Sequence, residues 1–142
     1  MVPVVNPIGN IRICVDLKKL NEAVKRERLI MPNLEDISPK LVGAKVFSKL
    51  DASSGFYQIP LHPESTKLTC FMAPFGRFKF NRVPFGISRA PEIYQRKMLE
   101  LLEGQDGMAV LMDDILIYGS TVKEHDQRLN AVMEKIENSG LK

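Results

Sequence analysis

Short apolar runs separated by turn residues predict several strands along the chain. Residues 2–5 and 11–15 are apolar and β-prone, and they flank a turn made of Pro, Gly and Asn. A second hairpin is predicted within residues 67–83, which turn at Pro74–Gly76. The run KVFSKLD is a further strand, and residues 107–120 form a tight hairpin with almost wholly apolar arms. Most strands are therefore expected in antiparallel hairpins.

The strand that returns from the second turn alternates between polar and aromatic side chains. Arg77 and Lys79 face one side of this strand, whereas Phe78 and Phe80 face the other. Basic residues on a strand face occur in surfaces that contact nucleic-acid phosphates and also in faces that are simply solvated. We predict that Arg77 and Lys79 are exposed, and we take them as candidate nucleic-acid-binding residues.

Helical periodicity appears in three segments, at residues 32–44, 88–104 and 121–140. The last of these begins with Thr121 and Glu124, which have the spacing of a capping box. Helices that alternate with hairpins predict an α+β fold in which helices pack on an antiparallel sheet. The expected buried helix positions are Tyr94, Met98, Leu101 and Leu102 in the second segment and His125, Leu129, Val132 and Ile136 in the third.

Two adjacent aspartates interrupt the apolar hairpin at residues 107–120. Asp113 and Asp114 lie between its arms, where an unpaired carboxylate is costly and like charges repel. The hairpin contains no Lys or Arg, so a metal ion is an attractive partner for these acids. A third acid, Asp51, ends the strand KVFSKLD, and three carboxylates can hold two Mg²⁺ ions. On this spacing alone, a nuclease and a polymerase fit equally well.

Composition and charge limit the class of protein. The 142 residues are 44% hydrophobic and 26% charged, which is ordinary for one globular domain. The net charge of +3 comes from the first half, because residues 1–71 hold ten Lys and Arg against seven acids, and the rest hold ten of each. Cys14 and Cys70 lack metal-ligand spacing and are expected to be free thiols, so we expect an intracellular, cytoplasmic protein that is not secreted.

Four segments together resemble successive blocks of the reverse transcriptases, in the order and spacing of that family, and in particular the polymerases of gypsy-type long-terminal-repeat retrotransposons. These segments are RICVDLKKLN, FSKLDASSGFYQIPLHPESTKLTCF, PFGRFKFNRVPFGISRAPEIYQRKM and VLMDDILIYGSTVKEH. The resemblance implies an RNA-directed DNA polymerase with a right-hand fold. Residues of about 1–50 and 60–90 would belong to the fingers, and residues of about 51–59 and 91–142 to the palm.

The resemblance also assigns roles to individual residues. Asp51, Asp113 and Asp114 match the catalytic aspartates that bind two Mg²⁺ ions, for which Mn²⁺ can substitute. The expected partners are a primed RNA or DNA template and a deoxynucleoside triphosphate. Arg12 matches the arginine that grips the triphosphate, Phe56 the aromatic residue under the sugar, and Phe85 a residue of the nucleotide pocket. Packing in the core is the alternative for Phe85.

The chain departs from the family pattern in two places. Leu111 stands where an aromatic residue is common, and the first turn, NPIGN, lacks the lysines that members often carry. The turn around Asp113 also predicts a strained backbone at Met112. The family continues into a thumb and an RNase H domain, both expected to be absent here, so we do not expect the chain alone to be processive. A remnant that at most binds nucleic acid and a two-metal nuclease are the alternatives.

Overall fold

The structure is a computed structural model of the chain, and it describes residues 2–5, 9, 11–25, 32–111 and 114–142. The chain divides into two units. One consists of Met1–Glu27 and Phe56–Ala90, and the other of Arg28–Gly55 and Pro91–Lys142. Each unit therefore combines two separate stretches of sequence.

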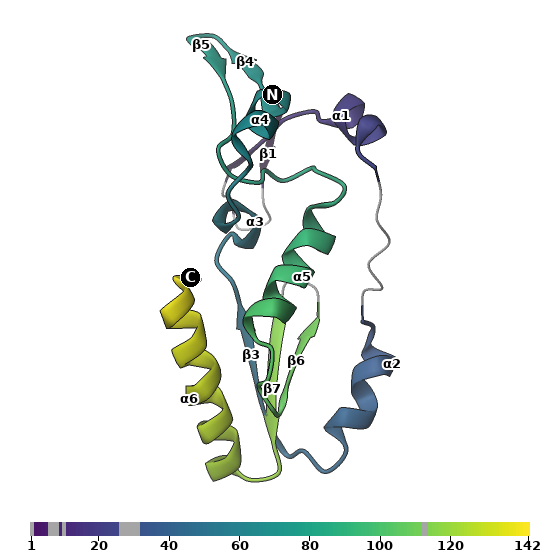
Figure 1. Ribbon diagram of the computed structural model, residues 1–142, viewed down its shortest axis with the longest axis vertical. Helices are drawn as coiled ribbons and strands as arrows, with labels where there is room; N and C mark the ends of the chain where they lie inside the picture. Colours follow the sequence, from purple (N-terminus) through teal and green to yellow (C-terminus); the bar gives the residue numbers. More distant parts are fainter. Residues whose placement is uncertain (1, 6–8, 10, 26–31, 112–113) are drawn as a thin grey trace. The chain divides into compact units, whose positions relative to one another are not determined.

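A three-stranded antiparallel sheet forms the centre of the second unit (Figure 1). Its strands are β3 (Val46–Asp51), β7 (Asp114–Gly119) and β6 (Met108–Leu111), in the order β3-β7-β6. The predicted strand KVFSKLD and the predicted hairpin of residues 107–120 are both confirmed. The pairing of β3 with β7 joins segments more than 60 residues apart, and it determines which side chains meet at the end of the sheet.

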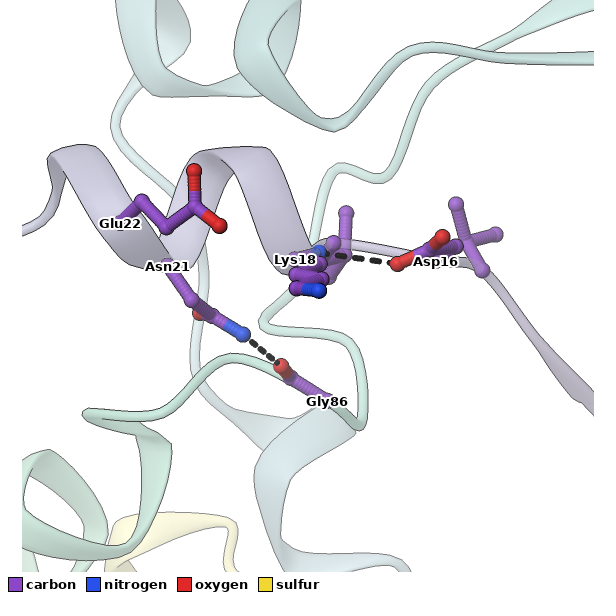
Figure 2. A pocket seen from close by; sticks show the side chains of 7 residues that line it. Asp16, Lys18, Asn21, Glu22 and Gly86 are labelled. Atoms are coloured by element: carbon purple, nitrogen blue, oxygen red, sulfur yellow. Dashed lines mark hydrogen bonds between the residues drawn. The ribbon is translucent and has the colours of Figure 1, made fainter.

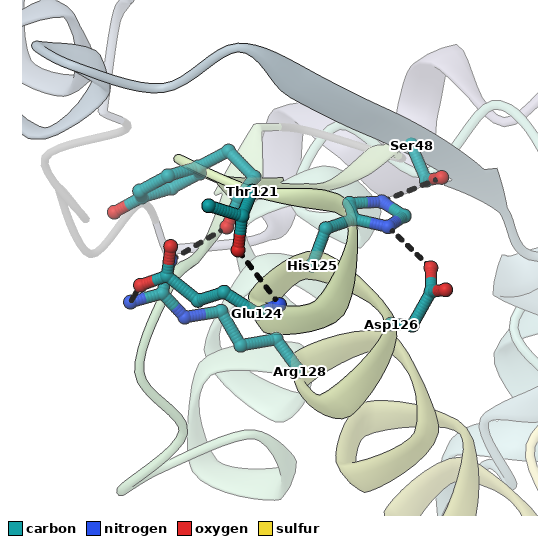
Figure 3. Close-up of polar contacts among 7 residues, drawn as sticks. Ser48, Thr121, Glu124, His125, Asp126 and Arg128 are labelled. Carbon is teal, nitrogen blue, oxygen red and sulfur yellow. Dashed lines mark hydrogen bonds and ion pairs between the residues drawn. The ribbon is translucent and has the colours of Figure 1, made fainter.

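The two faces of this sheet differ in burial. Ile115 and Ile117 point to one face and are almost completely buried, whereas Lys49 and Asp51 on β3 point to the other face and are exposed. Helix α6 (Val122–Ser139) contacts both β7 and β3. The predicted burial of His125 on this helix is confirmed, and its Nε2 atom lies 2.9 Å from Ser48 Oγ on β3 (Figure 3).

Ser48, His125 and Asp126 are linked in the order of a hydrolase triad (Figure 3). Ser48 lies at His125 Nε2, and Asp126 Oδ1 lies 3.0 Å from His125 Nδ1. These contacts nevertheless have a structural role, which is to join α6 to the sheet. Ser48 alternates with the exposed Lys49 along β3 and therefore lies on the face that α6 covers. The imidazole thus joins helix to sheet while both of its nitrogens have a polar neighbour.

Helix α5 (Ala90–Leu101) also belongs largely to the second unit. Its predicted stripe is mostly confirmed, because Tyr94, Met98 and Leu102 are buried, while Leu101 is half-buried. Gln95 is also completely buried, which the apolar stripe did not predict. Its amide Nε2 donates to the backbone oxygen of Val110 on β6 over 3.1 Å, and this bond compensates for the burial of the amide nitrogen, whereas Oε1 is buried without a hydrogen-bond partner among the described residues.

The N-terminus of α6 is capped by the predicted pair of Thr121 and Glu124, with a further contact to Ser120. Thr121 Oγ1 accepts from the Glu124 amide over 3.2 Å (Figure 3). The Glu124 carboxylate accepts from the Ser120 amide and hydroxyl and also forms a hydrogen bond with the Thr121 backbone. These hydrogen bonds lower the pKa of Glu124, and the nearby guanidinium of Arg128 adds to the effect. The helix therefore begins at a charge-assisted cap.

The remaining helices and strands are short. In the second unit, α2 (Leu34–Ile37) starts at Asn33, which forms a capping box with Asp36. The helix continues as a 3₁₀ helix, Ser38–Leu41, and the two together confirm the helix predicted in this segment. In the first unit, the predicted hairpin of β1 and β2 is confirmed. The elements of that unit are β1 (Val2–Val5), β2 (Ile11–Cys14), α1 (Lys18–Ala23), α3 (Gly55–Gln58, whose first residue falls in the second unit), α4 (Pro63–Thr66), a 3₁₀ helix (Lys67–Thr69), β4 (Phe71–Ala73) and β5 (Gly76–Phe78).

The second predicted hairpin is shorter than expected. Its turn lies at Pro74–Gly76 as predicted, but Lys67–Thr69 is a 3₁₀ helix rather than the start of a strand. The hydroxyl of Thr69 explains the difference, because it donates to the Thr66 carbonyl over 2.8 Å and accepts from the Phe80 amide over 3.1 Å. A local side-chain bond therefore competes with the sheet ladder at this point.

Within the described residues, none of the helices combines the length and the apolar composition needed to cross a membrane. Cys14 and Cys70 are free, as predicted from their separation in the sequence.

The sheet of the second unit should depend strongly on Ile117, which has no exposed surface. We expect Ile117→Ala to lower the free energy of unfolding by about 2–5 kcal/mol, because it removes buried carbon and leaves a cavity. Met133→Ala on α6 is the control, since Met133 is 46% exposed and should cost less than about 1 kcal/mol. Urea unfolding followed by circular dichroism measures both changes, and equal losses would contradict this assignment of the core.

Candidate functional site

Two of the three candidate carboxylates meet at the end of the central sheet. Asp51 is the last residue of β3 and Asp114 the first of β7, and the register pairs these two residues directly. Directly paired residues share a face of the sheet with their Cβ atoms about 4.5–5.5 Å apart. Asp113 lies outside the described residues, as does Met112, for which the sequence predicts strain. The predicted convergence is therefore seen for Asp51 and Asp114.

A lysine on the neighbouring strand supplies the positive charge that the hairpin lacks. Lys49 Nζ lies 2.8 Å from Asp114 Oδ2, and the two side chains are 65% and 36% exposed. The hydrogen bond to Asp114 raises the pKa of Lys49, as does the Coulombic attraction of Asp114 and Asp51. Lys49 is therefore protonated at neutral pH. Lys49 was not predicted as a site residue because it lies outside the hairpin, although its spacing of two from Asp51 puts both residues on one strand face.

The residues present have the donor chemistry that a divalent cation requires. Hard cations such as Mg²⁺ prefer carboxylate oxygens, and two aspartates of the described chain lie side by side here. The ion pair with Lys49 shows that this end of the sheet attracts a cation. In the part of the chain that the structure describes, three or more metal-ligating side chains do not gather at one point, and Asp113 is not in that part.

In the first unit, Phe56 and Phe85 pack against each other. Their ring centroids lie 5.3 Å apart in an edge-on arrangement, and Tyr57 contacts Phe85 at 5.1 Å from a second side. Both phenylalanines are half-buried. The ring of Phe85 is thus held in place by packing while part of its surface stays accessible, which is compatible both with a core role and with a place in a pocket.

The loop that follows Phe85 is held by the side-chain amide of Asn21 on α1. Asn21 Nδ2 donates to the Gly86 carbonyl over 2.7 Å, and Asn21 Oδ1 accepts from the Ser88 amide over 2.9 Å. Gly86 has a φ of +97°, a conformation that favours glycine. Asn21 and Gly86 border a pocket of about 550 Å³, shown in Figure 2, together with Val15, Asp16, Leu17, Lys18 and Glu22. Asn21 was not predicted, since a side-chain amide 65 residues from its partner gives no local signal in the sequence.

The basic candidates occupy two hairpins of the first unit. Arg77 lies on β5 opposite Met72 and Lys79 directly follows this strand, and both are exposed as predicted. The predicted alternation in burial is not seen, because Phe78 between them is exposed as well. Phe78 points to the other side of β5, where its ring stacks on Phe71. Arg12 lies on β2 opposite Val4, but its side chain is outside what the structure describes.

Comparison with known proteins identifies the family. The family model described as "Reverse transcriptase (RNA-dependent DNA polymerase)" matches residues 4–142, nearly the whole chain. The chain belongs to the reverse transcriptase family. The resemblance of its sequence blocks to this family is therefore confirmed, whereas the match does not distinguish gypsy-type elements from other groups.

Curated relatives of this reverse transcriptase chain include two viral polyproteins. The chain is 37% identical over 134 residues to the "Enzymatic polyprotein" of Figwort mosaic virus, with 94% of the chain aligned. It is 34% identical over 137 residues to the protein of the same name from Cauliflower mosaic virus, with 96% aligned. In both comparisons the chain spans 20% of the relative's length.

Solved structures of the foamy viral protease-reverse transcriptase have the same fold. The chain matches the selenomethionine-labelled Prototype Foamy Virus enzyme with a TM-score of 0.87 and 27% identity, covering 98% of this chain and 19% of that one. It matches the enzyme in complex with double-stranded DNA with a TM-score of 0.82 and 26% identity, covering 98% and 29%. The predicted α+β fold of the fingers and palm is thereby confirmed.

Asn21 provides a test of how the loop after Phe85 is held. We expect Asn21→Ala to speed hydrogen exchange of the Ser88 amide, because it removes the acceptor of that amide together with the donor to Gly86. Asn21→Asp retains the acceptor and should preserve more of the Ser88 protection than Asn21→Ala does. Asn130→Ala on the exposed side of α6 is the control. Unchanged exchange in Asn21→Ala would contradict the proposed restraint.

Proposed function

We propose that this chain forms the nucleotidyl-transfer centre of an RNA-directed DNA polymerase from a gypsy-type long-terminal-repeat retrotransposon. The observation that supports this most directly is the pairing of Asp51 with Asp114 on one face of the sheet. The two residues are 63 positions apart and come from two of the blocks that resemble the family. The match of the family model over residues 4–142 favours a polymerase over a two-metal nuclease with similar acids.

Asp51, Asp113 and Asp114 would hold two Mg²⁺ ions, or Mn²⁺ in their place. When bound, such a pair of ions stabilises both the attacking and the leaving oxygen at a phosphorus centre. The carboxylates of the chain fix the position of the positive charge at the end of β3 and β7. Of the three, Asp51 and Asp113 are proposed to contact the metals most directly.

The deoxynucleotide would be bound by residues of the first unit. Arg12 is proposed to grip the triphosphate, since a guanidinium can form bidentate hydrogen bonds with phosphate. Phe56 is proposed to lie under the sugar, and Phe85 to line the pocket through its half-buried ring. The contacts of Phe85 with Phe56 and Tyr57 support this proposal, because they keep the ring in one orientation.

The template and primer would lie against exposed basic residues, among them Arg77 and Lys79. Two solved relatives are described as complexes, one with double-stranded DNA and one with an RNA/DNA hybrid, which makes such a duplex the natural candidate. We propose that the second unit is palm and the first unit is derived from the fingers. The sequence predicts residues up to about 50 in the fingers and residues 51–59 in the palm. The pairing of β3 with β7 is the reason for assigning β3 to the palm, and the division of the chain at Phe56 is the reason for assigning residues 56–59 to the first unit.

The aspartates provide the main test of this function. In a polymerase that contains this chain, Asp51→Asn and Asp113→Asn should each lower primer extension by about 100-fold or more, because a lost metal ligand removes several kcal/mol of transition-state stabilisation. Asp106→Asn is the control, since Asp106 is exposed and precedes the start of β6, whereas Asp114 pairs with Leu111 at the other end of that strand. Primer extension on an RNA template with Mg²⁺ and deoxynucleotides measures the effect. Near-normal extension by Asp51→Asn would refute the proposal, and inactivity of the unchanged polymerase would favour a remnant.

Phe56 provides a test of the nucleotide site. We expect Phe56→Val to reduce the preference for deoxynucleotides over ribonucleotides by about tenfold or more, because a smaller side chain leaves room for a 2′-hydroxyl. Phe75→Val is the control, since Phe75 is 81% exposed at the β4–β5 turn. Competitive incorporation of the two nucleotide types measures the ratio. A ratio equal to that of the unchanged polymerase would assign Phe56 to packing alone.

A further inference from the structure

Lys49 lies beside the candidate metal centre, and no role has yet been assigned to it. It lies on β3, two residues before Asp51, and its side chain is 65% exposed. Its ammonium group contacts Asp114 on the neighbouring strand. Lys49 therefore lies on the same strand as one proposed metal ligand, Asp51, and contacts another, Asp114.

The geometry of the sheet explains this contact. The register pairs Asp51 with Asp114 and Lys49 with Leu116, so all four residues lie on one face. Lys49 and Asp114 are diagonal neighbours, a separation that a long side chain can bridge. The ammonium group takes up one of the two oxygens of the Asp114 carboxylate.

The electrostatic consequence concerns the protein without metal. Asp51 and Asp114 are like charges paired directly across two strands, an arrangement that destabilises a sheet. The positive charge of Lys49 offsets part of this repulsion. An ion pair between two partly exposed groups is weak in water, so it can be broken when a stronger cation arrives.

We propose that Lys49 is a built-in counter-cation of the acidic site, which holds the Asp114 carboxylate in the metal-free protein and competes with divalent metal for it. This inference rests on the proposed metal centre. A divalent ion that binds Asp114 must displace the ammonium group from Oδ2 or approach the carboxylate beside it. In both cases the positive charge of Lys49 raises the metal concentration that the site requires. Lys49 is thus a positioning residue.

Calorimetric titration of the 142-residue chain with Mg²⁺ at constant ionic strength tests this role without measuring activity. We expect Lys49→Met to lower the half-saturating Mg²⁺ concentration by about tenfold, because it removes a unit charge close to the site. Lys49→Arg keeps the charge and should stay within about twofold of the unchanged chain. Lys97→Met is the matched control, since Lys97 forms a similarly exposed ion pair with Glu100 on α5.

Asp51→Asn separates failure of the inference from failure of the metal centre. Saturable Mg²⁺ binding that is abolished by Asp51→Asn would establish the metal centre. An unchanged or weaker Mg²⁺ affinity in Lys49→Met would then overturn the role of Lys49 alone. If the unchanged chain shows no saturable binding, both the metal centre and the counter-cation are refuted. Circular dichroism verifies that each variant is folded, and Lys49→Gln replaces Lys49→Met if the latter is not.

Discussion

The antiparallel register between β3 and β7 is the constraint on which the candidate site depends. It aligns six residue pairs, and the last of them brings Asp51 and Asp114 together. Because side chains alternate along a strand, a shift of one residue would move Asp51 to the opposite face. The register is in turn fixed by burial, since the same shift of β3 would turn the charged Lys49 and Asp51 to the face on which Ile115 and Ile117 are buried. The apolar core of the sheet thus positions its carboxylates.

The two faces of the sheet consequently serve different purposes. One is covered by α6, where His125 bonds to Ser48 and Val132 is completely buried. The other presents Lys49 and Asp51 to solvent, which leaves the proposed metal centre accessible. Placing charges on the open face avoids the desolvation penalty that a buried carboxylate would suffer, while the covered face supplies the stability.

In the first unit, a loop without regular secondary structure is held by side-chain contacts. Residues 85–88 are fixed by ring contacts of Phe85 and by the two hydrogen bonds of Asn21. A loop held on both its aromatic side chain and its backbone loses little further entropy when a ligand binds. Such a restraint suits a segment that is proposed to line a nucleotide pocket.

The sequence by itself determined the main strands and helices, the α+β class, the family and the identity of the candidate acids. These follow from local patterns: short apolar runs in β3 and β7, helical periodicity in α5 and α6, and acids placed among apolar residues. The tertiary structure decided the register of β3 against β7, the ion pair of Lys49 with Asp114 and the bonds of Asn21 and Gln95. It also decided that residues 67–69 form a 3₁₀ helix. Each of these depends on a partner that the linear pattern does not name, because a polar side chain has many possible partners and only the folded chain selects one.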